Sequence, residues 1–312
     1  MENQFYNALP YVHISQACND ALQYIDSRRK GETNSLETRW KKLNKQCMGG
    51  IEENSIYTIL GISGSGKSAF ANILENDLID LNPGEEVEVL NFTWEMLSSR
   101  QVGRKLSAKV KTPTSRIYSV EKKLSDDEFT VIKNAIKPIY KYSIYYVDKI
   151  GSVKEFEETV LKFYTNKVKG TGKKFVVMID HTLLTKKESG ASTLNTISDL
   201  QTTLIQLKKL PKTSIIQLSQ MNRNIEDVSR IQNPNLHYPM RSDLSSADSV
   251  YQASDYVICL HRPEILGIQQ YGPDKHDTYG RIFLHIIKNR DGGQTGIIIL
   301  RNELAQNNMV EE

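Results

Sequence analysis

The chain has 312 residues, of which 39% are hydrophobic and 25% are charged. These proportions are those of a globular protein, so they exclude a collagen-like, mucin-like or largely disordered chain. The 40 basic and 37 acidic residues give a net charge of +3. That balance excludes a polybasic binder, but it is compatible with a few basic loops that line a nucleic-acid channel.

The sequence shows no sign of a membrane or secreted protein. The apolar run Phe175–Ile179 is too short to cross a bilayer, and residues 1–10 lack the basic and apolar regions of a signal peptide. The three cysteines, Cys18, Cys47 and Cys259, are too far apart for a disulfide framework or a zinc site. We therefore expect a cytoplasmic protein with no membrane partner and with idle or buried thiols.

The first 36 residues are polar and show helical periodicity only from Ile14 to Ile25. The following stretch, Ser27–Ser35, has the composition of a hinge or linker. We interpret the basic residues 28–30 as a solvated helix end rather than a nucleic-acid contact. The predicted organisation is a helical or linker segment over 1–36, one main domain over 37–305 and a polar tail over 306–312.

From Ser55 onward, short β-rich runs alternate with helical stretches. Most of these runs are nearly continuously apolar, as expected for strands covered on both faces. Ser125 with Glu128, and Ser152 with Glu155, fit capping boxes that begin two of the helices. The alternation predicts an α/β fold with a mostly parallel sheet, and residues 289–295 predict the turn of a C-terminal β-hairpin. The predicted strands are Ile56–Leu60, Val87–Phe92, Ser143–Val147, Phe175–Ile179, Ser214–Leu218, Tyr256–Leu260, Arg281–Ile287 and Gly296–Leu300.

Residues 61–68 match the pattern G-x-x-x-x-G-K-[ST] after an apolar strand and before a predicted helix. Glycines in such a loop let backbone amides point inward at a helix N-terminus, where they bind phosphate. Lys67 would contact the β and γ phosphates, and Ser68 would offer its hydroxyl to Mg²⁺. A chance glycine-rich turn is the alternative. The predicted nucleotide-binding residues are Gly61, Ser63, Gly64, Ser65, Gly66, Lys67 and Ser68.

Two further functions require carboxylates. Asp180 ends the apolar strand Phe175–Ile179, which is the setting of a Walker B aspartate that holds Mg²⁺ through water; Asp148, in a similar setting, is the alternative. Glu95 follows the strand Val87–Phe92, which we expect beside the phosphate loop, and could activate water there. A carboxylate in the first turn of a helix is the alternative for Glu95. We expect His181 to be packed or hydrogen-bonded rather than a metal ligand.

Together these features resemble the ATPase domain of DnaB-type replicative helicases, which has a RecA-like P-loop NTPase core. The similarity follows the family order from about Thr38 to Leu300. The segments that carry it, besides the phosphate loop, are Phe92-Thr93-Trp94-Glu95-Met96, residues 216–223 (IQLSQMNR), residues 239–244 (PMRSDL), residues 249–255 (SVYQASD) and Lys288-Asn289-Arg290-Asp291-Gly292.

The resemblance implies a role for each matching residue. Glu95 is implied to be the base that activates water, Asp180 the Walker B acid, and Gln220 and Arg104 groups near the γ-phosphate of ATP. Lys288 and Arg290 are implied to reach the nucleotide of a neighbouring subunit, with Arg290 as an arginine finger.

The resemblance also implies a homohexamer that acts on single-stranded or forked DNA. DNA would meet two polar loops, residues 186–192 and 223–241, through Lys186, Lys187, Arg223 and Arg241; ordinary surface loops are the alternative. The segment before the motor would be a linker helix that packs on the adjacent subunit, and a primase or a helicase loader is a candidate partner.

The chain departs from the family pattern in two places. His181-Thr182-Leu183 replaces the family's Tyr-Leu-Gln after the Walker strand, and Ser245 stands where the family often has arginine. The sequence therefore predicts a 5′-to-3′ helicase motor of a phage or bacterial replicon. Another RecA-like ATPase, either a recombinase or a KaiC-type protein, and a non-catalytic scaffold or loader are the alternatives.

Overall fold

The computed structural model describes residues 9–187, 190, 192–244, 247–293 and 296–312. The chain divides into two compact units, Met1–Ser35 and Leu36–Glu312. In the first unit, helix α1 (Ile14–Lys30) begins after His13, whose side chain accepts a hydrogen bond from the backbone N–H of Ser15, and ends at Gly31 with φ of 73°. The three basic residues predicted to form a solvated helix end occupy its last turn, where they favour the negative end of the helix dipole.

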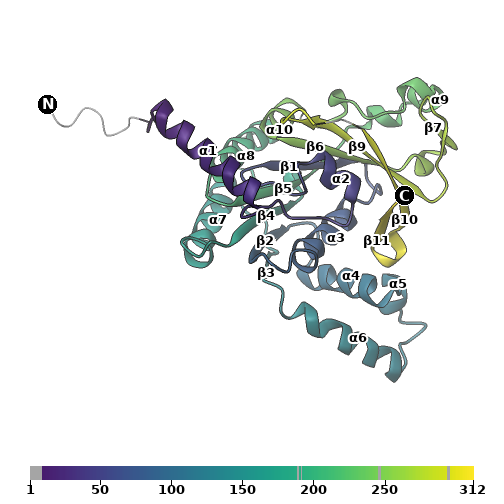
Figure 1. Cartoon of the computed structure of the whole chain (residues 1–312). Helices are drawn as coiled ribbons and strands as arrows, with labels where there is room; N and C mark the ends of the chain where they lie inside the picture. Colours follow the sequence, from purple (N-terminus) through teal and green to yellow (C-terminus); the bar gives the residue numbers. More distant parts are fainter. Residues whose placement is uncertain (1–8, 188–189, 191, 245–246, 294–295) are drawn as a thin grey trace. The chain divides into compact units, whose positions relative to one another are not determined.

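The second unit contains the sheet and the remaining helices (Figure 1). The α-helices are α2 (Lys41–Gln46), α3 (Lys67–Asp80), α4 (Ser98–Val110), α5 (Thr114–Ile117), α6 (Asp126–Ile139), α7 (Val153–Lys167), α8 (Thr193–Leu207), α9 (Val228–Gln232) and α10 (Ala247–Ala253). The strands are β1 (Ile56–Gly61), β2 (Val87–Thr93), β3 (Ile144–Val147), β4 (Lys174–Asp180), β5 (Thr213–Gln220), β6 (Tyr256–His261), β7 (Gln270–Tyr271), β8 (His276–Asp277), β9 (Arg281–Asn289), β10 (Ile297–Glu303) and β11 (Asn308–Glu311). The 3₁₀ helices are η1 (Thr182–Leu184), η2 (Arg223–Glu226), η3 (Pro234–Leu236), η4 (Arg241–Asp243), η5 (Pro263–Leu266) and η6 (Leu304–Gln306).

The main sheet has the strand order β11-β10-β9-β6-β1-β5-β4-β2-β3. The strands from β6 to β3 in this order are mutually parallel, whereas β9, β10 and β11 are added by antiparallel pairing. The predicted mostly parallel α/β fold and the C-terminal hairpin are therefore confirmed. Both predicted capping boxes are also present, at the start of α6 and of α7.

Helices cover both faces of the sheet. One core cluster packs Trp40 and Phe70, from the α2–α3 side, against strand residues such as Val176. A second cluster packs Phe156 of α7 and other helical side chains against Val177 and its neighbours. Successive strand residues point to opposite faces, so Val176 and Val177 contribute to different layers. Burial on both faces explains why these strands are almost continuously apolar.

Two expectations are wrong. The strand before Glu95, β2, does not lie beside the phosphate loop, because β5 and β4 separate it from β1. Residues 306–312 do not form a free polar tail either. Most of them belong to β11, which pairs with β10 and buries Met309 completely. The indole N–H of Trp40 donates to the carbonyl of Met309 at 3.2 Å, so this short strand is held by a partner distant in sequence.

Candidate nucleotide site

The phosphate loop joins β1 to α3. Gly64 and Gly66 have φ of 78° and 99°, a backbone region that disfavours residues with a Cβ. A Cβ at Gly66 would also lie 2.8 Å from Met309 Cε of β11. Gly66 is the N-cap of α3, so the loop amides precede the positive end of that helix. This local geometry is that of a phosphate-binding loop.

Lys67 is the first residue of α3, and its ammonium lies over the loop. Nζ donates to the carbonyl oxygens of Gly61 at 2.8 Å and Ile62 at 2.9 Å. Burial lowers the pKa of Lys67, whereas the negative charges of Asp180 and Glu95 oppose that shift. A phosphate group beside Nζ would offset the cost of burying this cation.

Asp180 ends β4 and is 6% exposed. Burial raises its pKa, and a hydrogen bond from the Ser68 side chain acts in the opposite direction. A hydroxyl oxygen beside a carboxylate is a donor set that suits Mg²⁺, and a bound cation would compensate the buried charge. The residues present therefore fit a magnesium ion. Asp148, the alternative, follows edge strand β3, and β2 lies between that strand and β4.

A cavity of about 540 Å³ gathers most of the predicted site residues. Its lining includes Lys67, Ser68, Glu95, Arg104 and Gln220. Arg104 Nη1 is buried and has no hydrogen-bond partner among the residues that the structure describes. A buried guanidinium donor without an acceptor is costly, so an anionic ligand in this cavity would satisfy it.

Glu95 reaches the cavity by a route that strand order alone did not indicate. The segment after β2 crosses the end of β4, where the Glu95 backbone N–H donates to the carbonyl of Asp180 at 3.3 Å. Glu95 is not a first-turn helix residue, because α4 begins at Ser98. His181 is not simply packed: it lines the cavity, and its Nε2 lies 3.9 Å from Glu95 Oε2.

Sequence reasoning missed part of the cavity wall. Thr114 and Ser115 of α5, and Leu304, Ala305 and Asn307 at the end of β10, also line it. The Asn307 side chain donates to Asn72 Oδ1 of α3 at 2.9 Å, which fixes this segment beside the phosphate-loop helix. The pairing of β10 with β11 carries residues 304–307 to the site, and no local sequence pattern signals it.

The structure places Lys288 and Arg290 outside this cavity, near the C-terminal end of α10. Lys288 Nζ donates to the carbonyl of Tyr251 at 2.6 Å. Arg290 pairs with Asp255, with Nη1 and Oδ1 3.0 Å apart, and also donates to the carbonyl of Gln252 at 3.0 Å. The side chain of Arg290 remains half exposed.

The predicted DNA contacts lie in two places on the surface. Lys186, Lys187 and Arg223 are exposed, whereas Arg241 donates to Asp248 at 2.9 Å and stacks over the Tyr251 ring at 4.7 Å. Residues 188, 189 and 191 of the first predicted loop, Ser245, and residues 294–295 of the predicted hairpin turn lie outside the described residues. No helix in the described chain is both long and apolar enough to span a bilayer.

Comparison with known proteins agrees with this fold. A family model of the DnaB-like helicase C terminal domain matches residues 35–308, and the chain therefore belongs to that family. The replicative DNA helicase DnaB of Buchnera aphidicola subsp. Schizaphis graminum (strain Sg) is 26% identical over 235 residues, which cover 74% of this chain and 47% of that protein. The chain thus spans about half the length of the curated relatives it matches.

Two solved structures share the fold. One is an ATPase domain determined by itself, which superposes with a TM-score of 0.79 at 22% identity and covers 97% of this chain and all of that one. A DnaB-like replicative helicase, in a structure that describes its interactions with primase, gives a TM-score of 0.76 at 21% identity. That match covers 96% of this chain and 67% of the helicase.

Proposed function

We propose that this chain is the motor of a replicative DNA helicase, which hydrolyses ATP in a hexameric ring and moves 5′-to-3′ along single-stranded DNA. The cavity beside the phosphate loop is the observation that carries this proposal. It brings a lysine, a magnesium-compatible Ser68–Asp180 pair, the carboxylate of Glu95 and an unpaired arginine donor to one place. Membership of the DnaB-like helicase family supports the same function.

Each residue has a distinct proposed role in hydrolysis. Lys67 binds the β and γ phosphates, and Ser68 and Asp180 hold Mg²⁺, which when bound neutralises developing phosphate charge. Glu95 accepts a proton from the attacking water. Gln220, the last residue of β5, and Arg104 of α4 contact the γ-phosphate.

Assembly into a ring is proposed from α1 and from the C-terminal hairpin. Ile14, Leu22 and Ile25 of α1 are exposed apolar side chains, and a helix of this kind gains stability by burying them on a neighbouring subunit. Lys288 and Arg290 would exchange their contacts near α10 for the nucleotide of that neighbour. Deleting residues 1–29 should weaken hexamers while the monomer still binds nucleotide, and sedimentation of the truncated protein tests this.

The proposed nucleic-acid partner is single-stranded or forked DNA, held through phosphate contacts of the exposed loop cations. A primase or a helicase loader is the proposed protein partner; one structural relative is described in its interactions with primase. We also propose a cytoplasmic location, in a bacterial cell or a phage-infected host, because the relatives are bacterial DnaB proteins.

Steady-state ATP hydrolysis and displacement of a strand from forked DNA test this function, beside nucleotide titration. Glu95→Gln should lower hydrolysis by ~10²–10⁴-fold and leave ATP and Mg²⁺ affinity near wild type. Asp180→Asn should weaken Mg²⁺ dependence and turnover together. Open filaments on DNA instead of closed rings would favour a recombinase-like ATPase, and absence of hydrolysis with DNA present would favour a scaffold.

A further inference from the structure

The segment that carries Glu95 is tied at both ends to one carboxylate. Asp148 Oδ1 accepts hydrogen bonds from Thr93 Oγ1 at 2.6 Å and from the Ser98 backbone N–H at 3.1 Å. Its second oxygen, Oδ2, accepts from Ser98 Oγ at 2.9 Å. Thr93 is the last residue of β2 and Ser98 the first of α4. Asp148 therefore closes the connection that contains Glu95.

The contact with Ser98 supplies what the start of α4 does not provide for itself. The residue before the helix is Leu97, which has no polar side-chain atom, and residues 98–101 include no acidic side chain. The first backbone N–H groups of a helix have no partner within the helix, and a negative charge there is favourable. Asp148 provides both the acceptor and the charge from a different strand.

Asp148 does not belong to the nucleotide cavity, whose lining does not include it among the described residues. Burial tends to raise its pKa, but the hydrogen bonds from Thr93 and Ser98 outweigh that effect and lower the pKa. The carboxylate is therefore ionised at neutral pH, and its oxygens are occupied by the Glu95 segment. This arrangement suits a group that acts through another residue rather than on the substrate.

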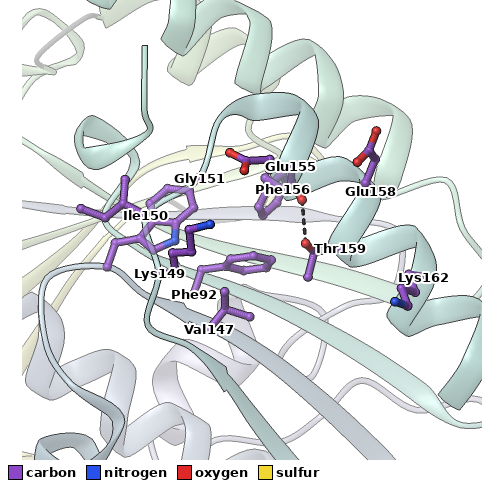
Figure 2. A pocket seen from close by; sticks show the side chains of 11 residues that line it. Phe92, Val147, Lys149, Ile150, Gly151, Glu155, Phe156, Glu158, Thr159 and Lys162 are labelled. Atoms are coloured by element: carbon purple, nitrogen blue, oxygen red, sulfur yellow. Dashed lines mark hydrogen bonds between the residues drawn. The ribbon is translucent and has the colours of Figure 1, made fainter. Parts of the chain in front are cut away.

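A second cavity, of about 300 Å³, adjoins the same segment. Trp94, which precedes Glu95, and residues 149–151, which follow Asp148, both line it. Figure 2 shows Glu155 and Glu158 of α7 at this cavity. Glu155 belongs to the capping box of α7, whereas Glu158 is a carboxylate of the same neighbourhood that lies outside the Asp148 contacts. Glu158 therefore offers a matched control.

We propose that Asp148 is a positioning residue for ATP hydrolysis, which holds Glu95 in place by fixing Thr93 and Ser98 on either side of it. The inference rests on the proposed role of Glu95 as the base. Displacement of a reacting group by about 1 Å can lower a rate by ~10²-fold. Loss of the Asp148 contacts should therefore lower the rate of the chemical step and spare nucleotide binding, which depends on the phosphate loop.

The whole chain is assayed for ATP hydrolysis with single-stranded DNA and for nucleotide affinity. Asp148→Ala should lower kcat by ~10–10²-fold with KM and nucleotide affinity within about threefold of wild type. Asp148→Asn should recover most of that loss, because an amide oxygen can accept from Thr93 and the Ser98 N–H while its NH₂ donates to Ser98 Oγ. Glu158→Ala should match wild type.

A double variant separates positioning of Glu95 from other effects. In a Glu95→Gln background, Asp148→Ala should cause no further loss, because there is no base left to position. The same fold-loss in both backgrounds would overturn the inference, as would wild-type hydrolysis by Asp148→Ala, an Asn variant as slow as the Ala variant, or a loss of nucleotide affinity as large as the loss of kcat.

Two outcomes distinguish this inference from the proposed function. If Glu95→Gln alone hydrolyses ATP at the wild-type rate, the role of Glu95 fails, whatever Asp148 does. If Glu95→Gln is inactive and Asp148→Ala is normal, only the inference fails. Should Asp148→Ala not fold, Thr93→Val removes one of the three contacts with little change of shape; a smaller loss of kcat supports the inference, and an unchanged kcat overturns it.

Discussion

Lys105 Nζ lies 2.5 Å from Glu75 Oε2, and the two side chains are 1% and 0% exposed. Glu75 belongs to α3, which follows the phosphate loop, and Lys105 belongs to α4 and is adjacent in sequence to Arg104. The Glu75 carboxylate also accepts hydrogen bonds from Asn91 and Tyr146. The buried pair therefore joins the two helices that bring Lys67 and Arg104 to the nucleotide cavity.

Breaking this pair should be costly, because the carboxylate would remain buried without its cation. Lys105→Met should lower the free energy of unfolding by about 3–5 kcal/mol. Lys109→Met, which removes a more exposed partner of Asp80, should cost about 0–1 kcal/mol. Denaturant titration of both variants measures the difference, and equal costs would show that the buried pair has no special weight.

Two buried histidines should make the protein less stable in mild acid. The Tyr271 hydroxyl lies 2.8 Å from His261 Nδ1 and 2.9 Å from His285 Nε2. Burial lowers the pKa of both histidines to about 3, and nearby positive groups, His285 and Arg230 for His261 and His276 for His285, add to that effect. In the unfolded chain a histidine titrates near about 6.5.

The unfolded state therefore binds more protons between these two pKa values. Stability from the neutral histidines is fully present above about pH 6.5 and is lost as the pH falls toward 3, by up to ~1.4 kcal/mol per pH unit for each histidine. Urea titrations between about pH 5 and 6.5 measure this slope. His285→Gln should reduce it by about half, and an unchanged slope would rule out His285 as a contributor.

Arg290 is expected to act on the nucleotide of a neighbouring subunit. Arg290→Ala should lower hydrolysis by ~10³-fold or more and spare ATP binding, and Asp255 keeps Lys208 as a partner at 2.6 Å. Mixing this variant with Lys67→Ala protein should restore some hydrolysis, because an intact site can form between the two kinds of subunit. Arg301→Ala, on the adjacent strand β10, is the control. Inactive mixtures that do form mixed rings would contradict the prediction.

The exposed loop cations should contribute to DNA affinity through phosphate contacts. Replacing Lys186, Lys187 and Arg223 with alanine should weaken binding at every sequence and reduce the slope of log affinity against log salt by up to ~2, at about 0.7 per contact with a single strand. Fluorescence anisotropy over a range of salt concentrations measures this slope. Replacing Lys122, Lys123 and Lys141 changes net charge equally and should leave the slope unchanged; equal effects would indicate a general charge effect.

Local signals in the sequence were sufficient for the elements and for the phosphate loop. Continuous apolar runs predict strands such as β4 because burial on both faces excludes polar side chains, and the serine–glutamate spacing predicts the starts of α6 and α7 because both partners lie within one turn. The pattern at residues 61–68 specifies a loop whose conformation and function depend on its own glycines and lysine.

Tertiary structure decided which distant residues share the site. Glu95 meets Asp180 because β2 pairs with β4, although two strands separate β2 from the phosphate loop. Residues 304–307 line the cavity because β11 pairs back on β10, which a polar composition did not reveal. Asp148 resembled a metal ligand in sequence, yet its oxygens hold Thr93 and Ser98. Contacts between residues far apart in the chain depend on strand order and packing, which carry no local signal.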